Sequence, residues 1–203
     1  MITIIDYGMG NLGSIQNMFK RIGAASEITG DTEKIASASK LLLPGVGAFD
    51  AAMTRIAESG ILETLNKKVL EDKTPVLGIC LGMQLLTRSS EEGRLPGLGW
   101  VNAKTVRFNF PQDPSLKVPH MGWNRVEQVN ESPLTRDLPE EPRFYFVHSY
   151  YVLADDAADV LMTTHYGLDF HSVIQRNNIY GAQFHPEKSH KFGMKLLENF
   201  SRL

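Results

Sequence analysis

Short apolar runs alternate with amphipathic segments along roughly the first ninety residues of the chain. The apolar runs predict strands at residues 2–5, 26–29, 40–43 and 76–79. Apolar positions at helical spacing predict helices at residues 12–22, 32–37, 48–59 and 61–70. Strands that alternate with helices across short loops indicate a doubly wound parallel sheet, in which ligands bind beyond the carboxyl ends of the strands.

The pattern changes after about residue 93. Strands are predicted at residues 101–108, 118–129, 144–153, 160–164, 172–175 and 179–184, without helices between them, and an amphipathic helix follows at 191–201. Asn177 and Asn178 predict a hairpin turn. We see no linker, repeat or low-complexity tract, so residues 1–203 are expected to form one α/β domain, with an additional β region in the second half.

Composition and charge narrow the class of protein. The chain has 203 residues, 42% of them hydrophobic, and a net charge of −2, which gives no reason to expect nucleic acid or an anionic membrane as a partner. Its single cysteine cannot form an internal disulfide, and no metal-ligand spacing is present. Without a signal-peptide pattern or a membrane-spanning apolar run, a cytoplasmic location is expected.

A cysteine flanked by two glycines follows the strand predicted at residues 76–79. Gly78 and Gly82 lie two residues before and after Cys80, which is the spacing of a nucleophile elbow. Glycines fit there because a strained turn leaves no room for neighbouring Cβ atoms. A thiol at the start of a helix also lies at the positive end of the helix dipole, which favours the thiolate. The alternative is a small buried hydrophobe, and the local pattern favours neither interpretation.

A glycine-bearing turn follows the first strand. Gly8, Gly10 and Gly13 formally meet the G-x-G-x-x-G pattern of a phosphate loop. No acidic residue ends a clear second strand about 20 residues further on, as a dinucleotide site requires. A structural turn that faces a partner is therefore the favoured interpretation.

A histidine and a glutamate follow the last predicted strand. His185 and Glu187 are two residues apart, so in an extended segment their side chains would share a face, and Pro186 stiffens the backbone between them. A cysteine, a histidine that takes its proton and a carboxylate that orients the imidazole form the constellation of cysteine hydrolases. A lone histidine is more often a surface or core residue, but none of the other five has a carboxylate at this spacing beside a proline.

Several motifs together resemble a known family. Three stretches of this chain resemble the class I glutamine amidotransferases, namely Gly78-Ile-Cys-Leu-Gly-Met-Gln84, Pro44-Gly-Val-Gly47 and His185-Pro-Glu187. Further stretches resemble the glutaminase subunits of imidazole glycerol phosphate synthases, namely residues 5–12, 119–124, 145–150 and 183–189. The resemblance implies a three-layer, flavodoxin-like fold with a mainly parallel central sheet and an additional antiparallel β region in the second half.

The resemblance also implies how the catalytic residues act. Cys80 would attack the side-chain amide of glutamine, His185 would act as base and then as acid, and Glu187 would orient His185. The oxyanion hole would use the amide of Leu81 and one from the loop that contains Val46 and Gly47. Glycines on both sides of Val46 would let its peptide turn over, so this loop could wait in an inactive orientation.

Substrate-holding residues follow from the same resemblance. Gln84 and Glu92 would lie near the α-amino end of glutamine. His148, Ser149 and Tyr150 would hold the α-carboxylate, chiefly through backbone amides. From the residues alone, Gln84 and Glu92 could equally be solvated surface side chains, and the segment from Tyr145 an ordinary aromatic-rich strand.

The last group of implied residues concerns a partner. Trp123, Met121 and His120 lie in a segment whose strand pattern is broken by a proline and a glycine, and exposed tryptophan and methionine often mark an interface. The resemblance places them, with Asn11, on the surface that docks in a heterodimer on a (β/α)8 barrel, the cyclase subunit. A partly buried packing role for Trp123 is equally open.

The expected function is therefore ammonia supply. Glutamine would be hydrolysed here without a metal or organic cofactor, and the ammonia would pass to the cyclase subunit, which makes imidazole glycerol phosphate and aminoimidazole carboxamide ribotide in histidine biosynthesis. One alternative is a free-standing cysteine hydrolase or an amidotransferase subunit with a different synthase. Another is a non-catalytic flavodoxin-like module that binds a phosphate.

Overall fold

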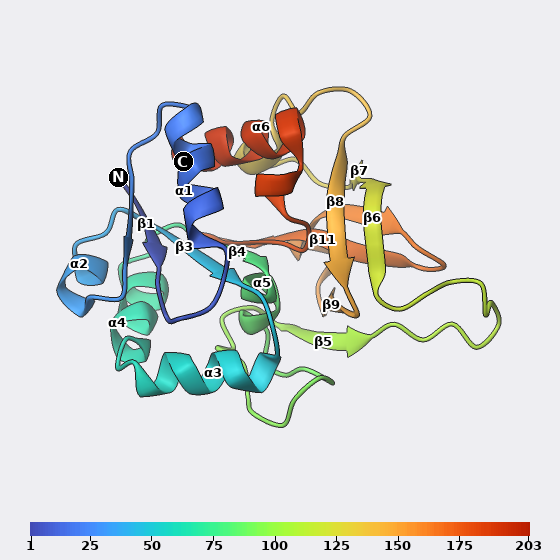
Figure 1. Cartoon of the computed structure of the whole chain (residues 1–203), viewed down its shortest axis with the longest axis horizontal. Coiled ribbons are helices and arrows are strands. Elements are labelled where there is room, and N and C mark those ends of the chain that lie inside the picture. Colours follow the sequence, from blue (N-terminus) through green and yellow to red (C-terminus); the bar gives the residue numbers. More distant parts are fainter.

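Five parallel strands form one half of a central ten-stranded sheet (Figure 1). The computed structural model describes residues 1–203. The parallel strands run in the order β2-β1-β3-β4-β12, with bounds β2 (Ser26–Thr29), β1 (Ile2–Ile5), β3 (Lys40–Gly45), β4 (Val76–Cys80) and β12 (Ile179–Ala182). Strands β1 and β4 are buried along their whole length, as their continuous apolar sequences predict for a sheet covered on both faces.

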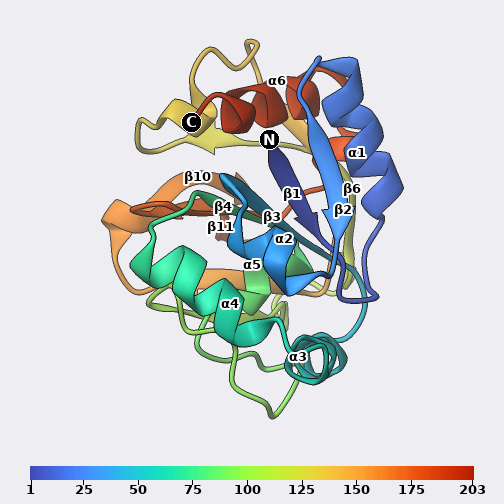
Figure 2. The same ribbon diagram turned by 90° about the vertical axis from the view of Figure 1, so that its left-hand side faces the viewer.

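Helices cover both faces of this sheet (Figure 2). Helices α1 (Leu12–Arg21) and α6 (His190–Ser201) lie on one face. Their buried side chains, including Phe19 of α1 and Phe200 of α6, belong to one hydrophobic core. The other face carries α2 (Thr32–Ala36), α3 (Phe49–Glu58), α4 (Leu62–Asn66), the π-helical turn η1 (Lys67–Glu71) and α5 (Leu81–Leu85). A second core containing Phe49 and Leu65 lies between them and the sheet.

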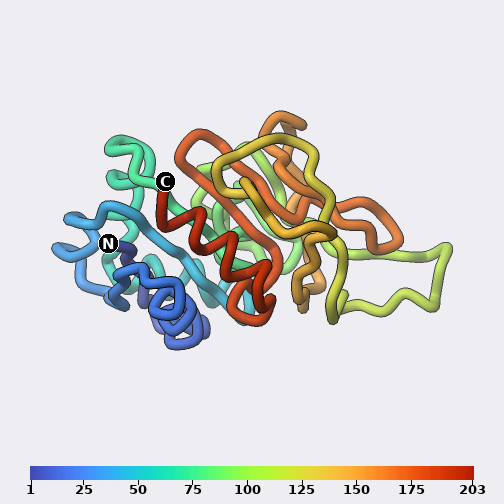
Figure 3. The backbone as a smooth tube through the Cα atoms, turned by 90° about the horizontal axis from the view of Figure 1, so that it is seen from above, coloured from blue at the N-terminus to red at the C-terminus, as the bar shows by residue number.

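The second half of the chain extends the sheet with antiparallel strands. Beyond β12 follow β11 (Asp169–Arg176), β10 (Val160–His165) and the short β7 (Glu127–Gln128), while β9 (Tyr150–Ala154) pairs with β11 and with β5 (Ala103–Arg107). A separate antiparallel pair consists of β6 (His120–Arg125) and β8 (Arg143–His148). The connection between β5 and β6 projects from the body of the molecule (Figure 3).

The predicted fold class is confirmed, and the predicted elements of the first half occur within two residues of their expected bounds, except that the helix expected at 61–70 is divided into α4 and the π-helical turn η1. The antiparallel half differs more. The single strand expected at 118–129 is two strands with different partners, separated at the buried Val126, and the one expected at 144–153 is divided at Ser149 into β8 and β9. Short 3-10 turns, η2 (Pro133–Thr135) and η3 (Ala157–Asp159), also lie where no helix was expected.

None of the helices combines the length and apolar character that crossing a bilayer requires, the longest being α6 with 12 residues. The cytoplasmic location and the single domain over residues 1–203 stay predictions.

Candidate active site

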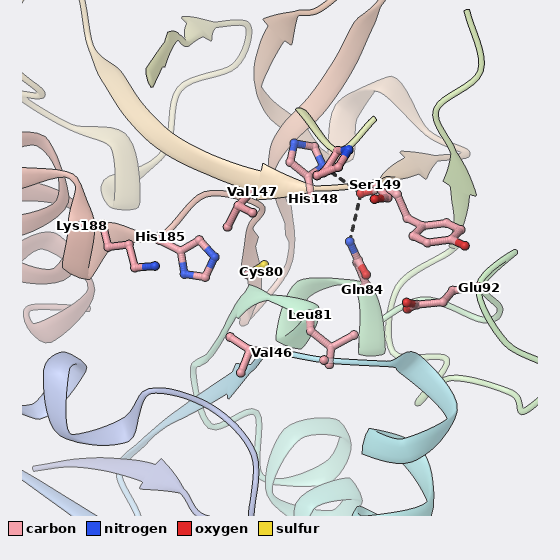
Figure 4. Close-up of a pocket in the computed structure, with 13 residues that line it drawn as sticks. Val46, Cys80, Leu81, Gln84, Glu92, Val147, His148, Ser149, His185 and Lys188 are labelled. Carbon is pink, nitrogen blue, oxygen red and sulfur yellow. Dashed lines mark hydrogen bonds between the residues drawn. The ribbon is translucent and has the colours of Figure 1, made fainter. Parts of the chain in front are cut away.

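Three motifs that are distant in sequence meet because their strands are neighbours. Strands β3, β4 and β12 are adjacent and parallel, with Gly45 opposite Cys80 and Ile79 opposite Ala182. Their carboxyl ends therefore lie at one edge of the sheet, where ligands of open α/β sheets bind. A cavity of about 380 Å³ opens there (Figure 4), lined by Val46, Gly47, Cys80, Leu81, Gln84, Glu92, Pro119, Val147, His148, Ser149, Tyr150, His185 and Lys188.

Cys80 occupies a strained turn between β4 and α5. Its φ of 54° and ψ of −110° lie where L-residues are rarely found. The glycines on each side are needed because of close backbone approach: a Cβ on Gly78 would lie 2.6 Å from the carbonyl oxygen of Gly82, and a Cβ on Gly82 would overlap the carbonyl oxygen of Leu43. The elbow predicted from the spacing is thus present in the backbone.

His185 and Glu187 form a buried pair beside this elbow. The Nδ1 atom of His185 lies 2.9 Å from Oε1 of Glu187, and the two side chains are 4% and 3% exposed. We expected an extended segment here, but residues Pro186–Lys188 form the 3-10 turn η4. Ser189 stabilises this turn because its hydroxyl donates to the carbonyl of His185 and accepts from the amide of Tyr145.

The two neighbours of the His185 ring determine its protonation. Burial alone lowers the pKa of His185, but hydrogen bonds and charge from Cys80 and Glu187 outweigh this and raise it to about 9. Nδ1 faces Glu187, and the buried Nε2 has no hydrogen-bond partner in the resting site, whose cavity both His185 and Cys80 line. The ring thus lies between a carboxylate and a thiol, which is the arrangement that activates a cysteine nucleophile.

The loop after β3 contributes the other wall of the cavity. Val46 is 44% exposed, and Gly47 has a φ of 107°, which favours glycine. The buried Tyr7 hydroxyl donates to the carbonyl of Pro44 at 2.7 Å and so anchors the start of this loop. Val46, Gly47 and Leu81 all line the cavity, as the predicted oxyanion hole requires.

The predicted substrate-holding residues also line the cavity. Gln84 is only 5% exposed, so it is not a solvated helix residue, and its Nε2 donates to the carbonyl of Tyr150 at 3.0 Å. Glu92 accepts from the amide of Phe49 at 3.0 Å. Although Glu92 as a residue is exposed, partial burial of its carboxylate raises its pKa. His148, Ser149 and Tyr150 connect β8 to β9 along the opposite side.

Two residues of the site received no role in the sequence analysis. Gln183 is completely buried, with its Nε2 3.8 Å from Sγ of Cys80 and its Oε1 3.1 Å from Nε2 of Gln84. The sequence signal was an uncharged polar residue at the end of the apolar strand β12. Lys188 lines the cavity and lies with its Nζ 5.5 Å from the centre of the Tyr145 ring. The sequence feature that could have identified Lys188 is its position directly after the His-Pro-Glu motif.

The residues predicted for a partner surface separate into two groups. Met121 and Trp123 are 62% and 45% exposed, and Asn11 is exposed as well. His120, by contrast, is 3% exposed, and its ring faces inward from β6. The prediction of His120 as a docking residue is therefore corrected: side chains alternate along a strand, and β6 is continuous despite Gly122.

Comparison with known proteins agrees with the geometry. The family described as "Glutamine amidotransferase class-I" matches residues 3–202. The chain is 60% identical to the imidazole glycerol phosphate synthase subunit HisH 2 of Methanococcus maripaludis over 98% of both chains. It is 50% identical to the protein of the same name from Pseudomonas aeruginosa over the full length of both.

Solved structures show the same fold at low sequence identity. PurLQS from Thermotoga maritima matches with a TM-score of 0.74 at 17% identity, over 98% of this chain and 96% of that one. A glutamine amidotransferase from Thermotoga maritima matches with a TM-score of 0.65 at 20% identity, over 92% and 75%. The resemblance stated from the motifs is confirmed: the chain belongs to the class I glutamine amidotransferase family, in the group that contains the HisH subunits of imidazole glycerol phosphate synthase.

Proposed function

We propose that the chain hydrolyses glutamine to glutamate and ammonia at the Cys80 cavity. Because its raised pKa keeps the His185 ring charged at neutral pH, His185 already holds the thiol proton, and the Cys80 thiolate attacks the amide carbon of the substrate. His185 then passes this proton to the amide nitrogen, which leaves as ammonia, and a glutamyl thioester remains. Water attacks the thioester, His185 accepts a proton from the water and returns it to the sulfur, and glutamate is released. Glu187 holds the ring in the orientation that both transfers need.

The oxyanion formed in each step needs donors at the cavity wall. The amide of Leu81 follows the nucleophile directly, and the loop at Val46 and Gly47 supplies a second amide once its peptide faces the cavity. Gln84 and Glu92 bind the α-amino end of glutamine. The segment 148–150 binds its α-carboxylate.

One observation carries this proposal. A buried imidazole lies between the only cysteine of the chain and a buried carboxylate, in the cavity at the ends of β3, β4 and β12. For stability alone, apolar side chains would serve better at these positions, because burying a charged pair costs free energy.

The proposal includes a partner, the cyclase subunit, in a heterodimer. Met121 is paired across the strands with Val147, which lines the cavity, and Val118 and Val46 are exposed near the same opening. Exposed apolar side chains of this kind are typical of a protein interface. Docking of a (β/α)8 barrel here would cover the cavity, so that ammonia passes to the second active site without protonation by bulk water.

The test is a glutaminase assay with and without the cognate cyclase and its nucleotide ligand. Glutamate production should be slow in the isolated chain, rise strongly in the loaded complex, and vanish in Cys80→Ala. A Cys80→Ala complex that still releases glutamate would refute Cys80 as nucleophile. Equal turnover with and without the cyclase would instead indicate a free-standing hydrolase.

A further inference from the structure

Two buried histidines contact each other beneath the exposed face of β6. His120 and His148 are cross-strand partners in the β6–β8 pair, 3% and 5% exposed, with Nδ1 of His120 3.0 Å from Nε2 of His148. Phe146 and Phe170 pack against both rings. The proposed reaction gives neither ring a proton to carry, so a different reason is needed for placing two polar rings in an aromatic core.

The hydrogen-bond partners assign the proton on each ring. Nδ1 of His148 lies 2.8 Å from the carbonyl oxygen of Tyr150, which can only accept, so Nδ1 carries the proton. Nε2 of His148 must then accept from Nδ1 of His120 if both rings are neutral. This leaves Nε2 of His120 as an acceptor for Nδ2 of Asn124 at 3.2 Å.

The Asn124 end of this series of hydrogen bonds is fixed independently of the two histidines. The Asn124 amide nitrogen donates to the carbonyl of His165 at 2.9 Å, and its oxygen accepts from the amide of Arg125 at 2.8 Å. The side chain therefore cannot be turned over without loss of both bonds. Burial lowers the pKa of His120 to about 4 and that of His148 to about 3, which agrees with two neutral rings. The bonds thus all run in one direction, Asn124 to His120 to His148 to Tyr150.

The carbonyl of Tyr150 connects this series of hydrogen bonds to the glutamine site. It accepts from His148 and also from Nε2 of Gln84, as the dashed lines in Figure 4 show. The second hydrogen of Gln84 Nε2 is donated to Oε1 of Gln183. Both hydrogens of the Gln84 amide are therefore used within the protein, and its oxygen is the end left for a ligand.

We propose that His120 and His148 are positioning residues that hold the Tyr150 carbonyl in place and thereby keep the oxygen of the Gln84 side chain directed at the substrate. The inference rests on the proposed glutaminase function, in which Gln84 receives the α-ammonium group of glutamine. Substrate binding would depend on these histidines more than the chemical step does, because neither ring reaches the reacting atoms.

The first test reads the ring protons directly in the unaltered chain. Nitrogen NMR of histidine-labelled protein at neutral pH should show both rings neutral, with the proton on Nδ1, which is the minor tautomer of free histidine in water. A proton on Nε2 of His148 would overturn the inference, whatever the activity of the protein.

The second test uses matched variants in the complex with the cyclase subunit. His148→Gln removes the donor to Tyr150, and we expect the KM for glutamine to rise about tenfold while kcat falls less than about threefold. His148→Asn retains an amide near the position of Nδ1 and should keep KM within about threefold of the original. His120→Gln and His120→Asn should follow the same order with smaller changes.

His171→Gln provides the control. His171 is also partly buried and accepts from the amide of Ala154 at 3.0 Å, but it does not line the cavity. Its replacement should lower the melting temperature without a change in KM. An unchanged KM in His148→Gln, with normal turnover of the unaltered complex, would overturn the positioning role alone. An unaltered complex without glutaminase activity would refute the proposed function, and the inference with it.

Discussion

The amide nitrogen of Gln183 lies 3.8 Å from the sulfur of Cys80, inside a core where both side chains are buried. Its amide oxygen is already bonded to Gln84, so the nitrogen is the end that must face the sulfur. A donor in this position stabilises a thiolate more than a thiol, because hydrogen bonds to charged groups are the stronger ones.

Replacement of Gln183 should therefore slow the reactions of Cys80. Gln183→Met, which keeps the volume but removes the donor, should reduce the rate of Cys80 alkylation by iodoacetamide by about tenfold at neutral pH. Gln183→Glu should reduce it further, because a carboxylate beside the sulfur repels the thiolate. Alkylation of Gln183→Met at the original rate would show that this contact does not activate the thiol.

The His185–Glu187 pair predicts how stability depends on pH. The pKa of His185 is raised above its usual 6.5 to about 9, so its charged form contributes stability that is complete below pH 6.5. This contribution is lost as the pH rises through about 9. Thermal unfolding between pH 6 and pH 10 should show a falling melting temperature in the original chain and a flatter profile in Glu187→Gln.

Glu187→Gln should also impair the reaction itself. An amide cannot stabilise the imidazolium as a carboxylate does, so we expect kcat to fall on the order of a hundredfold. The assay is glutaminase turnover in the cyclase complex. A variant that keeps full turnover but loses the pH dependence of stability would restrict Glu187 to a structural role.

The parts of this site that could be predicted are those determined by local sequence. The elbow at Cys80 follows from two glycines at fixed spacing, and the placing of Cys80 and the loop 44–47 at one edge of the sheet follows from the rule that ligands gather at carboxyl ends of parallel strands. The His185–Glu187 contact was predicted from an extended backbone, whereas the structure makes it through a 3-10 turn. Here the spacing was informative although the assumed conformation was wrong.

The parts that could not be predicted depend on long-range register. His120 is buried because it lies opposite His148 across β6 and β8, a pairing that no feature of residues 118–129 alone specifies. Gln183 reaches Cys80 across 103 positions of sequence through the β4–β12 pairing. Such contacts require the assembled sheet.

The segment that carries Glu92 is fixed by the first turn of α3. The carboxylate of Asp50 accepts from the amides of Arg94 and Leu95, at 2.9 to 3.0 Å, while the amide of Phe49 donates to Glu92. Loss of these bonds should let Glu92 move away from the cavity. We expect Asp50→Ala to raise the KM for glutamine about fivefold, and Asp50→Asn, which keeps one oxygen acceptor, to raise it less. Equal KM values for the two variants would contradict this role of Asp50.

The glycines of the elbow can be tested against a glycine that has free space around it. A Cβ at position 82 would overlap the carbonyl oxygen of Leu43, and one at position 78 would lie 2.6 Å from that of Gly82, whereas nothing lies within 4 Å of a Cβ at position 13. Gly82→Ala should reduce the free energy of unfolding by more than about 3 kcal/mol, since the backbone of β3 or α5 must shift. Gly13→Ala lies in helix α1 and should raise it by about 0.5–1 kcal/mol.

Urea unfolding followed by circular dichroism measures both changes. Alkylation of Cys80 should also be slower in Gly82→Ala than in the original chain under conditions where that variant is folded, because the strained φ of 54° cannot be kept once the turn widens. Similar stabilities of the two variants would mean that the turn relaxes at little cost. The strain at Cys80 would then not depend on close packing between β3 and the start of α5.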